Sequence, residues 1–153
     1  MTREEKQPTR PIKDSRPIKD SRPIKDSRPN HRSADHRKAL GRWGEEQAAA
    51  YLSSLGVQIL ERNWRARSGE IDIICEADGR LIFVEVRTRR PSGRFGTAAE
   101  SVDARKQKQV RDTALVYLHA TRQMARSCRF DVVAVTAGSV QAKADITHIP
   151  NAF

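Results

Sequence analysis

Cysteine is scarce in this sequence, and long hydrophobic runs are absent from it. The 153 residues include two cysteines, Cys75 and Cys128, and neither has a second Cys or a His at a spacing typical of metal ligands. This pattern argues against a disulfide framework and favours two buried thiols in a reducing compartment. No apolar run approaches the roughly 18 residues of a membrane-spanning helix, and the N-terminus lacks the apolar segment of a secretory signal. We therefore expect a cytoplasmic protein that has no membrane partner.

Acidic residues are too few to balance the basic ones. The chain has 29 Lys and Arg against 19 Asp and Glu, which gives a net charge of +10. A surplus of this kind favours a polyanionic partner, and nucleic acid is the foremost candidate. Residues 1–38 carry +6 of the net charge, so the remainder of the chain is only mildly basic. Basic charge alone does not distinguish DNA from RNA.

The N-terminal segment is a tandem repeat. Residues 10–27 contain three copies of Arg-Pro-Ile-Lys-Asp-Ser, and a fourth copy begins at Arg28. A unit with one proline and one apolar side chain cannot bury a core, so residues 1–34 are predicted to be a disordered basic tail. The tail is either an arm that prolongs encounters with DNA through phosphate contacts or a solvated linker without a role. The remaining residues, 35–153, suffice for one domain.

Hydrophobic periodicity in residues 35–153 predicts the order α-β-β-β-α-β-β. A helical stripe runs from about Asp35 to Leu55, and Gly56 is typical of the residue that ends a helix. Strands are predicted over residues 57–64, 70–77, 80–89, 128–136 and 140–149, with a second helix over about 102–121. This order indicates an α/β domain with a mixed central sheet flanked by helices.

The two-residue turn Asp78-Gly79 predicts a hairpin and its register. Opposed residues then have numbers that sum to 157, so Asp72 faces Glu85 and Glu70 faces Arg87. Since side chains alternate along a strand, these four share one face with Ile74 and Phe83, and the opposite face is apolar: Ile71, Ile73, Val84 and Val86.

Two opposed carboxylates repel each other unless a cation or a shared proton compensates. A divalent cation such as Mg²⁺, which prefers oxygen ligands, would do so at Asp72 and Glu85. Such an ion can polarise a phosphodiester and lower the pKa of a bound water. The alternative is a half-solvated sheet face on which ion pairs such as Glu70–Arg87 offset the repulsion. The pattern leaves both interpretations open.

Several motifs together resemble the YraN family of uncharacterised, endonuclease-like proteins. They are Gly41 to Glu45, Arg62-Asn63-Trp64, Gly69 to Ile74, Phe83 to Arg89 and Arg129 to Val133. The resemblance covers about residues 38–153. It implies a distant branch of the restriction-endonuclease-like superfamily, which includes Holliday-junction resolvases and has an α-β-β-β-α-β core.

The resemblance also implies a set of site residues. In that superfamily a helix Glu, a strand Asp and a Glu-x-Lys motif on the next strand bind Mg²⁺ and support attack on phosphate. Glu45, Asp72 and Glu85 match the acidic positions, with Asp72 and Glu85 as ligands of Mg²⁺ or Mn²⁺. Arg87 occupies the lysine position; it cannot act as a general base, but it can stabilise developing negative charge.

Residues around this predicted site carry further interpretations. Lys106 or Gln109 could supply the missing polar group, although a solvated helix face is the preferred interpretation for both. The residues predicted to contact a phosphate backbone are Arg89, Arg90, Arg94 and Lys106, although the loop that carries the arginines could equally be an ordinary solvated connection. Trp43 and Trp64 could stack on bases, but core packing fits their positions better. Asp131 is predicted to be structural.

The resemblance implies a metal-dependent endonuclease acting on DNA, including branched or damaged DNA, and it raises the possibility of a homodimer. The alternative is a catalytically silent nucleic-acid-binding or scaffold protein, because Arg87 departs from the motif. A weaker third interpretation is an RNA-directed or ribosome-associated role.

Overall fold

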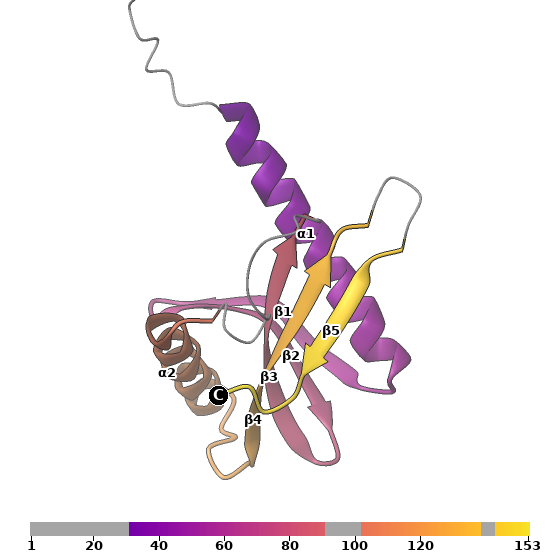
Figure 1. The fold of residues 1–153 in the computed structure, drawn as a ribbon. Helices are drawn as coiled ribbons and strands as arrows, with labels where there is room; N and C mark the ends of the chain where they lie inside the picture. The colour runs from indigo at the N-terminus through magenta and orange to yellow at the C-terminus, as the bar shows by residue number, and fades with distance from the viewer. Residues whose placement is uncertain (1–30, 91–101, 139–142) are drawn as a thin grey trace, which may run out of the picture.

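The computed structural model describes residues 31–90, 102–138 and 143–153 (Figure 1). Most of the predicted tail, together with Arg94, lies outside these ranges. The elements are α1 (His31–Ser54), β1 (Gln58–Ala66), β2 (Gly69–Ala77), β3 (Arg80–Arg89), α2 (Ala104–Ala120), β4 (Cys128–Thr136) and β5 (Asp145–Ile149). The predicted α-β-β-β-α-β core, followed by a fifth strand, is confirmed.

The five strands form one mixed sheet in the order β1-β2-β3-β4-β5. β1, β2 and β3 form an antiparallel meander, and β5 pairs antiparallel with β4. β3 and β4 are parallel, because α2 intervenes between them and returns the chain to the same end of the sheet. The mixed sheet predicted from the sequence is therefore confirmed.

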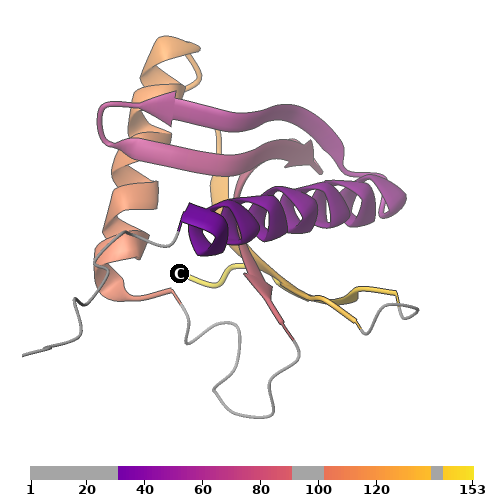
Figure 2. The same cartoon turned by 90° about the horizontal axis from the view of Figure 1, so that it is seen from above.

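The two helices cover opposite faces of the sheet (Figure 1). On one face, Ala48 and Leu52 of α1 pack against a cluster that includes Ile73, Val84 and Val133. On the other face, α2 packs against Ile71, Ile74, Leu81 and Phe83 through Val110, Ala114, Tyr117 and Leu118. Figure 2 shows the β1–β2 hairpin between the helices, its turn lying over α2. Asp72 and Glu85 are buried, whereas Glu70 and Arg87 are partly exposed, so the interpretation of a half-solvated face does not hold for the carboxylate pair.

The β2–β3 hairpin has the predicted register over five pairs, from Ala77–Arg80 to Ile73–Val84. The pairing of residues ends there, just before Asp72. Ile71 packs in the α2-side cluster with Ile74 instead of beside Ile73, so the predicted all-apolar face is wrong at this residue. The side chains of β2 do not alternate strictly between the two faces, because the regular pairing of β2 with β3 stops at Asp72. There the Asp72 side chain accepts a hydrogen bond from a backbone N–H of β3.

The ends of the elements differ in detail from the prediction. α1 begins at His31, four residues before the predicted domain boundary. It ends at Ser54, which leaves Leu55 of the predicted stripe 55% exposed. β5 begins at Asp145, later than the predicted residue 140. In the part of the chain that the structure describes, no helix is long and apolar enough to cross a membrane.

The two tryptophans are partly buried and pack against the core, as predicted. Trp43 packs against the cluster beneath α1, and Trp64 packs against the cluster beneath α2. The indole of Trp64 makes an edge contact with the ring of Tyr117 at a centroid distance of 5.3 Å. Cys75 is buried as expected, whereas Cys128 is only half-buried.

Candidate metal centre

Asp72 lies where β2 leaves its regular pairing with β3, and the residue is only 8% exposed to solvent. Its Oδ2 accepts a hydrogen bond from the backbone N–H of Val86 at 2.7 Å, which fixes the carboxylate beside β3. Burial, and then the negative charge of Glu85, raise the pKa of Asp72 to about 7, although the Val86 N–H and the Lys106 ammonium oppose the rise. Asp72 and Glu85 therefore interact, as the hairpin register predicts.

Glu85 is even less exposed, at 3%, and two cations accompany it. The Lys106 Nζ lies 3.0 Å from its Oε2, and the Arg87 Nε lies 3.8 Å from its Oε1. The ammonium of Lys106 is thus the nearer of these two positive charges. The preferred interpretation of Lys106 as part of a solvated helix face is wrong, because α2 packs against the sheet and directs this side chain to β3.

The first turn of α2 explains how Lys106 is held. Asp103 is the N-cap, and its Oδ1 accepts a hydrogen bond from the backbone N–H of Lys106 at 2.8 Å. Such caps satisfy an N–H that the helix itself leaves without a partner. Gln109, one turn further along, approaches the backbone of Gly69 so closely that a Cβ there would lie 2.2 Å from its Nε2. In the sequence, the feature that indicates this part of the site is therefore Asp103, which stands three residues before Lys106 at the start of a helix.

Glu45 comes from α1, which crosses β3 at close range. Its charge contributes to the raised pKa of Asp72, as the smallest of the contributions. Within the described ranges, however, no three side chains of His, Cys, Asp or Glu gather into a group that could hold a metal ion. The structure thus brings Asp72 and Glu85 together and leaves Glu45 as an electrostatic neighbour of the pair.

Gly44 permits the close approach of α1 to β3. A Cβ on this residue would lie 1.8 Å from the Oγ1 and 2.8 Å from the Cβ of Thr88. We expect Gly44→Ala to lower the free energy of unfolding by about 2 kcal/mol, because the branched Thr88 side chain has no flexible end that can move away. Urea unfolding followed by circular dichroism measures this change.

Gly41, one turn earlier in α1, is the matched control. A Cβ there meets nothing within 4 Å, so Gly41→Ala should stabilise the protein by up to about 1 kcal/mol through helix propensity alone. Equal effects of the two substitutions would contradict the close approach at Gly44.

The other predicted site residues are placed less centrally. Glu70 forms its ion pair with Arg65 of β1 at 3.0 Å, so the predicted Glu70–Arg87 pair is wrong. Arg89 is half-buried at the end of β3, where its carbonyl accepts the N–H of Ala137. Arg90 is exposed just beyond the strand. These two remain candidates for phosphate contacts.

The donor chemistry of the buried pair fits a hard divalent cation. Asp72 and Glu85 offer carboxylate oxygens, and Val86 already orients one of these carboxylates. A cation bound between them would relieve the repulsion that contributes to the raised pKa of Asp72. The residues that would hold Mg²⁺ or Mn²⁺ are therefore Asp72 and Glu85.

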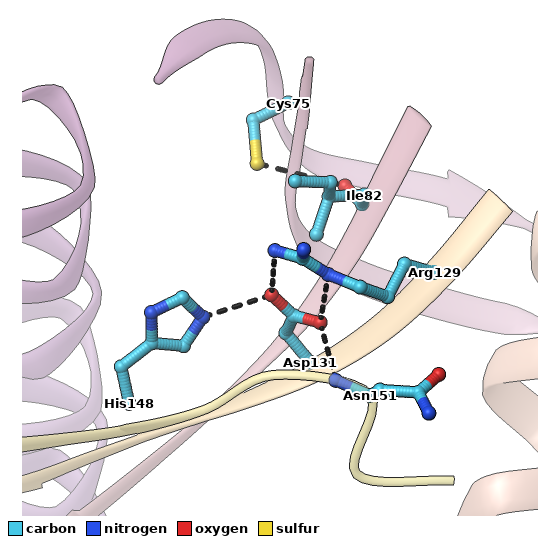
Figure 3. Close-up of polar contacts among 6 residues, drawn as sticks. All are labelled: Cys75, Ile82, Arg129, Asp131, His148 and Asn151. Carbon is cyan, nitrogen blue, oxygen red and sulfur yellow. Dashed lines mark hydrogen bonds and ion pairs between the residues drawn. The ribbon is translucent and has the colours of Figure 1, made fainter. Parts of the chain in front are cut away.

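A second buried carboxylate, Asp131 of β4, has a different environment (Figure 3). Its two oxygens accept hydrogen bonds from Nε and Nη2 of Arg129, both at 2.8 Å, from the His148 ring at 2.8 Å and from the Asn151 backbone N–H at 2.9 Å. The rings of Tyr51 on α1 and His148 lie nearly perpendicular to each other at a centroid distance of 6.1 Å. This network joins β4, β5 and the C-terminal residues, which supports the structural interpretation of Asp131.

Comparison with known proteins agrees with the resemblance in the sequence. A family model described as uncharacterised protein family UPF0102 matches residues 44–135. A UPF0102 protein of Syntrophomonas wolfei is 46% identical over 116 residues, which are 76% of this chain and 98% of that protein. A UPF0102 protein of Desulforamulus reducens is 49% identical over 123 residues, covering 76% and 97% of the two chains. One of Treponema pallidum is 41% identical over 120 residues, covering 77% and 94%.

Proposed function

We propose that this chain, which belongs to the uncharacterised protein family UPF0102, is a metal-dependent nuclease that hydrolyses phosphodiester bonds in DNA, including branched or damaged DNA. The observation that carries the proposal is the contact between the Lys106 Nζ and the Glu85 Oε2, next to the buried Asp72. It supplies an acidic pair and a lysine, three of the four groups that the superfamily motif combines, although the lysine comes from α2 instead of β3.

Each of these groups has a role that its chemistry permits. Mg²⁺ or Mn²⁺ bound by Asp72 and Glu85 would polarise the phosphate and lower the pKa of a water. The Lys106 ammonium, with three rotatable N–H donors, can orient that water and offset charge on the phosphate oxygens. Arg87, beside the other oxygen of Glu85, can stabilise negative charge in the same reaction. Glu45 keeps the site negative and thereby favours a cation.

Lys106→Met tests the proposal. The neutral side chain preserves most of the packing and removes the ammonium, so we expect cleavage of DNA to slow by about 100-fold. Cleavage is measured with Mg²⁺ or Mn²⁺ on duplex, flap, junction and single-stranded DNA substrates. The control is Lys108→Met on the same helix, because Lys108 is exposed and pairs with Asp112. A wild-type protein that cuts none of these substrates with either metal would refute the nuclease proposal.

One observation favours the alternative of a catalytically silent binding or scaffold protein. Lys106 and Arg87 already accompany Glu85, so its negative charge is compensated without a metal. Titration calorimetry with Mn²⁺ separates the two functions. Binding that Asp72→Asn abolishes supports the nuclease, whereas absence of binding to the wild-type protein supports the silent alternative.

A further inference from the structure

A cavity of about 600 Å³ opens beside the candidate metal centre, between α1 and the β1–β2 hairpin. Its lining includes Lys38, Gly41, Arg42 and Glu45 of α1 and Arg65 and Glu70 of the hairpin. The four α1 residues are spaced so that they share one face of the helix. Gly41 leaves open space on that face, since a Cβ would meet nothing within 4 Å.

A second cavity, of about 330 Å³, continues this one toward α2. The two share Arg65 and Glu70 in their linings, and the second is completed by Gly69, Lys106 and Gln109. We call them together the α1–α2 groove. The groove thus runs from α1 past the Arg65–Glu70 ion pair to α2.

Each part of the groove is lined by a residue that acts on the candidate metal centre. Glu45 lines its α1 part, and the charge of Glu45 acts on Asp72. Lys106 lines its α2 part and contacts Glu85. Asp72 and Glu85 are buried and do not line the groove, so a strand lying along it would contact Glu45 and Lys106, the two lining residues that act on these carboxylates.

The charges at the α1 end suit a polyanion. Lys38 and Arg42 are exposed one turn apart, and neither makes an ion pair with another residue that the structure describes. The Arg65 side chain is 75% exposed, so a phosphate can compete with Glu70 for its guanidinium. Three cations along one groove are a pattern that tracks a sugar-phosphate backbone.

We infer that the α1–α2 groove binds a nucleic-acid strand and that Lys38 and Arg42 contact phosphates on one side of the reacting phosphodiester. The inference rests on the proposed function, since it takes the reacting group to lie at Asp72 and Glu85. It adds a phosphate-binding surface on α1 to the arginines predicted at the end of β3.

Binding without catalysis tests this inference. The Asp72→Asn protein is titrated, in EDTA, against fluorescein-labelled single-stranded and duplex oligonucleotides at several salt concentrations. Adding Lys38→Ala and Arg42→Ala should weaken binding and reduce the slope of log K against log salt by about 2, roughly one for each lost phosphate contact. Arg37→Ala, an exposed arginine of α1 outside the groove lining, should change the slope by less than the two groove variants do.

A steric and charge variant supplies an independent measurement. Gly41→Glu places a carboxylate in the groove at a position with open space, and it should weaken binding about tenfold or more, while Gly41→Gln of the same size should weaken it less. Both variants should retain the melting temperature of the parent or raise it, because both side chains favour a helix more than glycine does.

The outcomes separate this inference from the proposed function. Loss of binding in the groove variants supports the groove even if the wild-type protein cleaves nothing. An unchanged salt slope, or an equal effect of Arg37→Ala, overturns the groove even if the protein is a nuclease.

Discussion

Asp72→Asn is expected to make the protein more stable at pH 8, by roughly 4 kcal/mol, although it removes a carboxylate from the centre of the candidate site. Burial and the charge of Glu85 raise the pKa of Asp72 from its ordinary value near 3.8 to about 7. Between these two values the folded protein holds a proton that the unfolded chain has released. The free energy of unfolding therefore falls as pH rises from about 4 to 7, by about 1.4 kcal/mol for each pH unit.

Asparagine has no such titration and can still accept the Val86 N–H through its amide oxygen. The difference between wild-type and variant should be small near pH 4 and largest above pH 7. Urea unfolding at pH 4.5, 6 and 8 measures it. Asp112→Asn, at an exposed carboxylate on α2, is the control and should show no gain that grows with pH. A variant less stable than wild-type at pH 8 would contradict the raised pKa.

The same carboxylate links stability to metal binding. A divalent cation requires ionised Asp72, so its apparent affinity should rise with pH up to about 7 and level off above it. Saturating Mn²⁺ should raise the melting temperature of the wild-type protein at pH 8 and leave that of Asp72→Asn unchanged. Cleavage should fall to background in this variant.

Asp131→Asn is expected to have the opposite effect on stability, a loss of about 3 kcal/mol at neutral pH. The Asp131 side chain is fully buried, and its two oxygens receive bonds from the Arg129 guanidinium, the His148 ring and the Asn151 backbone (Figure 3). Asparagine removes the negative charge that compensates Arg129. It also replaces one acceptor oxygen with a donor, which faces other donors.

Urea unfolding of Asp131→Asn measures this loss of stability, and Asp145→Asn is the control. Asp145 is an exposed carboxylate at the start of β5, so its substitution should change stability by less than about 0.5 kcal/mol. DNA binding measured below the unfolding transition should be preserved in both variants, because Asp131 lies outside the groove and the metal centre. A fully stable Asp131→Asn would show that the network contributes little.

The two aspartates show how far residue type alone can be interpreted. Both lie in strands among apolar neighbours, and the sequence suggested a metal ligand for Asp72 and a structural role for Asp131. The two aspartates differ in the number of hydrogen-bond donors around each carboxylate. Asp72 receives one backbone N–H and faces Glu85, whereas Asp131 receives bonds from three residues. Arg129 lies on the same strand, two residues before Asp131, whereas His148 and Asn151 come from β5 and the C-terminal residues, whose positions depend on the folded sheet.

Local rules of the chain determined the hairpin that carries the candidate metal centre. A two-residue Asp-Gly turn allows one register, and alternating apolar residues mark the strands, so the sequence by itself placed Asp72 near Glu85 and predicted the order of the core elements. Only the tertiary structure decided which cation meets these carboxylates. Lys106 reaches Glu85 because α2 crosses back over the sheet, and Glu70 turns to Arg65 because β1 pairs with β2. Contacts between distant elements depend on packing and crossover geometry, which no local spacing encodes.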